Sequence, residues 1–150
     1  MGLKTYVPNL CSLNENLSIQ SGTWTPTVIG STTAGTPTYA TQTGRYYRIG
    51  KMCFVDGFVK LSAKNDVAGA ILIGGLPFST MSGEPRSNVS IGAVAGVTYG
   101  TNKQLFAVFN AGLNTITPYF STEGAGVGLL NAASVNDNFE IRVGGVYRLP

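Results

Sequence analysis

The stretch GRYYRIGKMCFVDGFVKLSA, Gly44 to Ala63, decides the fold that the sequence predicts. Its second half alternates with a period of two, which a β-strand produces and a helix does not. The pattern predicts two strands joined by a tight turn at Gly50-Lys51. One face of the second strand is small and aliphatic, as in a packed interior, and the other meets a partner, a covering loop or water. The two faces carry Cys53, Val55, Gly57, Val59, Leu61 and Ala63 on one side, and Met52, Phe54, Asp56, Phe58, Lys60 and Ser62 on the other.

Further short strands are predicted on both sides of this hairpin, at the spacing typical of an all-β sandwich or barrel. A strand at 88–99 is expected to place Val89, Ile91, Ala93, Ala95 and Val97 on one face. Pro118 is expected to mark an edge strand, because proline lacks a ladder donor. We therefore predict an all-β fold, a jelly-roll-like antiparallel β-sandwich of about eight strands. The remaining runs are 22–30, 38–41, 70–73, 104–110, 114–120 and 139–149.

Residues 1–21 differ from the rest and are predicted to form an N-terminal arm, with the sandwich domain at 22–150. Leu10, Leu13 and Leu17 stand at helical spacing. So short a helix is marginal alone in water, so the segment either folds against a partner or is extended. The three leucines are the candidate residues for anchoring the segment to such a partner.

Composition excludes several classes of partner. Only 11% of residues are charged, and the net charge of +3 comes from scattered single residues. Without a Lys/Arg cluster we expect no nucleic-acid partner. No run approaches 18 apolar residues, so no membrane insertion is expected. Cys11 and Cys53 form no disulfide framework, and Cys53 is interpreted as a buried free thiol.

The residues give no support for catalysis. The chain has no histidine, which removes the usual acid–base residue and the histidine-dependent triads. A hydrolase would have to use two of the seven carboxylates, and no spacing favours a pair. The Gly-rich run 124–128 is interpreted as a hairpin loop and Asn136-Asp137-Asn138 as a turn. We therefore predict a protein that is not an enzyme, with no catalytic residue, cofactor or metal.

Aromatic residues are the remaining candidates for binding. Trp24, Tyr46, Tyr47, Tyr99 and Tyr119 are candidates for stacking on a glycan, although aromatics in strands more often lie in a core or an interface. Phe54 and Phe58 are candidates for a subunit contact. Asp56 and Lys60, on the same strand face, could pair with each other or with a neighbouring subunit.

Residues 22–63 resemble a domain recurrent in fibre and appendage proteins of tailed bacteriophages. The resemblance rests on G-T-W-T-P at Gly22 to Pro26 and on a G-x-Y-x-x-I-G-x-x-x-x-V-x-G pattern. That pattern is met by Gly44, Tyr46, Ile49, Gly50, Val55 and Gly57. The run I-G-G-L-P-F at Ile73 to Phe78 and the closing strand ending at Tyr147 also fit.

The resemblance implies a small β-sandwich that forms homotrimers on the virion exterior, with no catalytic motif to transfer. Because the chain has no shaft or β-helix, a decoration or head-fibre protein docked through residues 1–21 is expected. Phe54 and Phe58 would then lie at the trimer contact. The alternative is a tail-fibre module that recognises host surface glycans.

Overall fold

The computed structural model describes residues 18–83, 85–98, 100–101 and 103–150. All its strand pairs are antiparallel, which confirms the predicted all-β, sandwich-like class. A 3₁₀ turn, Ala132–Ser134, precedes the last strand. The strands are β1 (Ile19–Trp24), β2 (Thr27–Gly30), β3 (Thr38–Ile49), β4 (Met52–Ala63), β5 (Ile71–Gly74), β6 (Asn88–Val97), β7 (Lys103–Phe109), β8 (Ile116–Thr122), β9 (Val127–Leu129) and β10 (Val135–Arg148).

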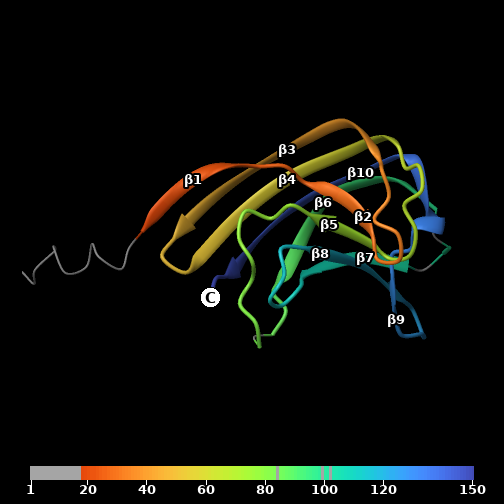
Figure 1. Cartoon of the computed structure of the whole chain (residues 1–150). Coiled ribbons are helices and arrows are strands. Elements are labelled where there is room, and N and C mark those ends of the chain that lie inside the picture. The colour runs from red at the N-terminus through yellow and green to blue at the C-terminus, as the bar shows by residue number, and fades with distance from the viewer. Residues whose placement is uncertain (1–17, 84, 99, 102) are drawn as a thin grey trace, which may run out of the picture.

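The strands form one curled sheet in the order β1-β3-β4-β10-β6-β7-β8-β5-β2, with β9 added to β8. Only two residue pairs join β6 to β7, at Asn88 and Val89. The sheet therefore folds over at this point. Figure 1 shows the long layer of β1, β3, β4, β10 and β6 arching over the shorter layer of β7, β8, β5 and β2.

The central hairpin is confirmed. Ile49 pairs with Met52 around the predicted turn, and Gly50 has a φ of 57°, a left-handed value that suits glycine. The predicted inner residues of β4 from Cys53 to Leu61 are all buried, whereas Met52, Phe54 and Asp56 are exposed. The sequence therefore assigned the faces of β4 correctly.

The predicted strand 22–30 is two strands, because the chain crosses between layers at Thr25-Pro26. β1 lies at one end of the strand order and β2 at the other. The amide of Gln42 donates to the carbonyl of Pro26 at 2.9 Å, and the hydroxyl of Tyr39 accepts from the Val28 amide at 3.0 Å. Side chains of β3 therefore hold this crossing.

Two predictions about strand environment are wrong. In β6 the pairing with β10 shifts register between Arg142 and Val143, so the alternation reverses: Ala93 and Ala95 are exposed and Val94 is half-buried. Pro118 lies on β8, which is interior, between β7 and β5. Its carbonyl accepts from the Leu130 amide at 3.1 Å. The backbone N–H that proline lacks would lie between the part of β8 that pairs with β5 and the part that pairs with β9, so no ladder hydrogen bond is lost.

The core lies between the two layers. Phe109 and Tyr147 pack at 4.8 Å between ring centroids, one from each layer. Cys53 is a buried free thiol, and burial raises its pKa. The largest fully buried side chains are Tyr147, Phe109, Phe139, Leu61, Ile71, Ile73, Ile116, Leu130 and Ile141.

Part of the predicted arm belongs to the sheet. β1 begins at Ile19, which pairs with Ile49, so residues 19–21 are strand residues. Leu10, Leu13, Leu17, Cys11 and Tyr99 lie outside the described residues. Among the residues that are described, no helix has the length and apolarity needed to cross a membrane.

Candidate binding surface on the long layer

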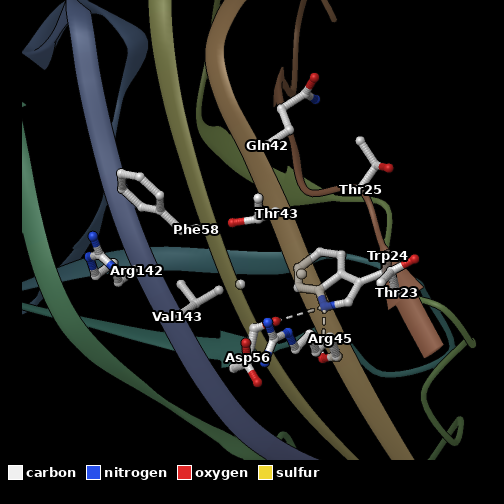
Figure 2. Close-up of a pocket in the computed structure, with 12 residues that line it drawn as sticks. Thr23, Trp24, Thr25, Gln42, Thr43, Arg45, Asp56, Phe58, Arg142 and Val143 are labelled. Carbon is white, nitrogen blue, oxygen red and sulfur yellow. Dashed lines mark hydrogen bonds between the residues drawn. The ribbon is translucent and has the colours of Figure 1, made fainter. Parts of the chain in front are cut away.

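The inner face of the long layer is organised around Trp24. Its indole lies on the paired glycines Gly44 and Gly57, where an added Cβ would come within 2.5 Å of the ring. The indole N–H donates to the carbonyls of Asp56, at 2.9 Å, and Arg45, at 3.2 Å (Figure 2). The G-T-W-T-P opening and two of the pattern glycines thus form one packing unit.

The outer face is the opposite side of the same strands. Directly paired residues share a face of a sheet, so the register assigns its members. Tyr47 pairs with Phe54, Arg45 with Asp56, and Phe58 with both Thr43 and Arg142. These side chains come from β3, β4 and β10 and lie opposite the buried residues. The outer face divides into an apolar part and a polar part.

The apolar part, called here the apolar patch, consists of Ile19, Tyr47, Ile49, Met52 and Phe54. Their exposed fractions run from 41% for Met52 to 68% for Ile19. The register places them in adjacent rows, with Ile19, Ile49 and Met52 in one row. A cluster of large exposed apolar side chains on a sheet is typical of an interaction surface.

The polar part surrounds a hollow of about 690 Å³ beside the apolar patch, called here the polar hollow. Figure 2 shows Phe58, Arg142, Thr43, Asp56 and Arg45 around it. Its full lining is Thr23, Trp24, Thr25, Gln42, Thr43, Gly44, Arg45, Asp56, Gly57, Phe58, Arg142 and Val143.

The charges of this region are unevenly paired. Lys60 and Glu140, which do not line the polar hollow, form an ion pair at 2.9 Å. Of the alternatives left open for Lys60, pairing with Asp56 is not the one observed, because Lys60 lies opposite Glu140 on β10. The guanidinium of Arg142 lies 4.1 Å from the ring centroid of Phe58. Across residues 18–150 as described, Arg45 and Asp56 have no ion-pair partner within 4.0 Å.

The structure separates the aromatic candidates for glycan stacking. Trp24 is only 6% exposed, so its ring offers almost no surface to a ligand. Tyr46 is half-buried and packs edge-on against Phe78 at 5.3 Å. Tyr119 stacks on Phe106 at 5.5 Å. Tyr47, 56% exposed, is the most accessible of the four.

Of the two candidates for a subunit contact, Phe54 is 45% exposed and belongs to the apolar patch. Phe58 is half-buried, with Arg142 over its ring. Sequence reasoning missed Arg45 and Arg142, because only the register of β3, β4 and β10 brings both onto the lining of the polar hollow. The sequence did carry one signal: each arginine stands at a position of its strand that alternation assigns to the outer face.

A second polar group is structural. Asn110 donates to the hydroxyls of Thr115, at 2.8 Å, and Thr117, at 2.7 Å, and its backbone carbonyl accepts from the hydroxyl of Thr80. All four residues are buried, and no buried side-chain polar atom in the described part of the chain lacks a partner. This network fixes the turn between β7 and β8. The same described residues hold no group of three metal-ligating side chains.

The fold is similar to part of a known phage protein. The chain superimposes on the crystal structure of Dettilon tailspike protein (gp208) with a TM-score of 0.73 and 20% sequence identity. The match covers 87% of this chain and 24% of the tailspike chain, so this chain corresponds to about a quarter of that protein. No family model and no curated protein matches the sequence.

Proposed function

We propose that this chain is a non-enzymatic structural domain of a bacteriophage particle, displayed on the virion exterior as a trimeric decoration or head-fibre protein. The observation that carries the proposal is the likeness of fold to a phage tailspike over 87% of the chain. The G-T-W-T-P and glycine pattern supports it independently, because those residues build the Trp24 packing unit described above.

The apolar patch is the surface proposed for trimer assembly. Phe54 and Tyr47 pair across β3 and β4, and Ile19, Ile49 and Met52 extend the patch to the sheet edge at β1. Burying such side chains against another subunit contributes about 25 cal/mol per Å² of apolar area. Phe58, under Arg142, would lie at the margin of this contact.

Residues 1–21 are proposed to dock the trimer onto the capsid or another virion protein, with Leu10, Leu13 and Leu17 as the anchors. Support comes from the position of β1, which starts at Ile19 and is an edge strand of the sheet. A leucine-bearing segment needs a partner surface to bury its apolar side chains.

The experiment uses particles assembled with the full chain, a chain lacking residues 2–17, or a Leu10→Ser/Leu13→Ser/Leu17→Ser chain. The deletion keeps β1 intact. We expect antibody against the β-domain to label intact particles carrying the full chain only. Circular dichroism of both variants controls for folding. The proposal is overturned if the chain is absent from particles, or if a folded deletion variant is still incorporated.

The second candidate is a receptor-binding module for host surface glycans. The polar hollow and the exposed ring of Tyr47 favour it, because both lie on a face that no other part of the described chain covers. A glycan array probed with the assembled protein tests it. We expect hits that are weakened, but not abolished, when Tyr47 is changed to alanine, and an array without hits contradicts this candidate.

A further inference from the structure

We propose that the polar hollow binds an acidic saccharide, a sugar ring bearing a carboxylate. This inference deepens the receptor-binding candidate above, by naming a ligand class and the residues that would hold it. Neither Trp24 nor the tyrosines predicted from sequence are its main contacts. The contacts proposed are the side chains of Arg45, Asp56, Phe58 and Arg142.

The size and position of the hollow suit a small ligand. Its volume of about 690 Å³ lies within the range of ordinary ligand sites, roughly 300–1,000 Å³. Gly44 and Gly57 contribute backbone rather than side chains to its lining. Across β10, the next residue paired with Asp56 is Gly144, which pairs in turn with Ser90. The small residues Gly144 and Ser90 therefore leave this side of the hollow open.

The charges favour a single negative charge on the ligand. Two arginines, Arg45 and Arg142, and one carboxylate-bearing residue, Asp56, line the hollow. Lys60 does not alter this balance, because Glu140 neutralises it outside the hollow. A guanidinium binds a carboxylate through two parallel hydrogen bonds, a geometry that lysine does not offer. The Phe58 ring orients one of the two, Arg142.

The remaining groups favour a polyol over a bare anion. An ionised carboxylate is an acceptor only, so Asp56 suits neighbouring hydroxyl groups of a sugar and repels a dianion such as phosphate. Threonine hydroxyls, which line the hollow from β1 and β3 at Thr23 and Thr43, donate and accept. Phe58, which also lines the hollow, offers an apolar surface to a sugar ring.

The test titrates the full-length protein with galacturonic acid, its methyl ester and inorganic phosphate. Trp24 is the only tryptophan, and its indole N–H is bonded to the carbonyls of the lining residues Arg45 and Asp56, so its fluorescence reports binding, and calorimetry gives the affinity. We expect the acid to bind at least about tenfold more tightly than the ester, since one charge-assisted pair is lost. Phosphate should neither bind nor compete.

Variants of the lining residues test which side chain contacts the carboxylate and which contacts the hydroxyl groups of the ligand. Arg45→Gln and Arg142→Gln should each weaken binding of the acid about tenfold and leave binding of the ester unchanged. Asp56→Asn should weaken both, because both carry the hydroxyls. Lys103→Gln, on β7 in the other layer, is the matched control and should change neither. Urea unfolding of each variant separates loss of binding from loss of fold.

Three results would overturn the inference: no titratable binding of the acid, equal affinity for acid and ester, or arginine variants that bind the acid like the parent. Competition by phosphate would instead identify a plain anion site, and also counts against it. Particle incorporation and oligomeric mass are measured separately. A failed titration with normal incorporation therefore rejects the saccharide site and leaves the structural proposal standing.

Discussion

The two faces of the β3–β4 hairpin differ in how far the rest of the chain covers their side chains and pairs their polar groups. On the inner face, the Trp24 indole has two backbone acceptors and a pair of glycines beneath its ring. On the outer face, Phe54 and Tyr47 remain about half exposed, without an intramolecular partner layer. The comparison suggests that the inner face determines the fold, whereas the outer face is left for a partner.

The largest effect is expected where the inner face is tightest. In Gly57→Ala the new Cβ would lie 2.5 Å from the Trp24 ring, and the ring cannot shift without breaking its hydrogen bonds. Overpacking of this kind should lower the free energy of unfolding by about 3 kcal/mol. Urea denaturation measures it. Gly128→Ala is the matched control, since it lies in β9 with no atom within 4 Å of the added Cβ. Equal stability of the two variants would contradict the packing role of Gly57.

Trp24→Phe should have the next largest effect. Phenylalanine cannot donate to the carbonyls of Arg45 and Asp56 and leaves part of the ring volume empty. We expect a loss of about 2 kcal/mol in the free energy of unfolding. The comparison on the outer face is Tyr47→Phe, which should change the stability of the subunit by no more than about 0.5 kcal/mol. A destabilisation of similar size at both positions would remove the distinction between the faces.

Alkaline pH should lower the free energy of unfolding slightly, because of Cys53 on the inner face. Burial raises the pKa of this thiol, so above its ordinary pKa of 9.0 the unfolded chain loses the proton while the folded chain keeps it. Stability therefore falls as pH rises through this range, by at most about 1.4 kcal/mol per pH unit for one group. Urea unfolding from pH 8 to 10 should show a shallower fall in Cys53→Ala than in the parent. Parallel curves would mean that Cys53 does not titrate differently on unfolding.

The sequence predicts the hairpin and its buried face because strand alternation is local information. Cys53, Val55, Gly57, Val59 and Leu61 are buried as the period of two indicates. The reversal in β6 was not predictable from that strand alone, since the bulge arises in its pairing with β10. The prediction of an edge strand at Pro118 was wrong for a similar reason. The sequence shows that the residue lacks a backbone donor, but it does not show which strands lie beside it.

The candidate surface was only partly predictable. Phe54 and Tyr47, which are exposed, were identified as candidate contact residues from the sequence. Large aromatic side chains stand out in a strand at the positions that alternation assigns to the outer face. The polar hollow was not found, because Arg45 and Arg142 are 97 positions apart and line the same hollow only through the register of three strands. The packing of Trp24 was not predictable from its own strand, because its partners, Gly44 and Gly57, come from two other strands.

The mass of the protein in solution tests most directly whether the outer face is an assembly surface. Light scattering would compare the parent chain with Phe54→Ser/Tyr47→Ser, which changes two exposed side chains of the apolar patch and should leave the subunit folded. We predict three times the chain mass for the parent and the chain mass for the variant at the same concentration. A monomeric parent, or a folded variant that remains trimeric, would contradict the account.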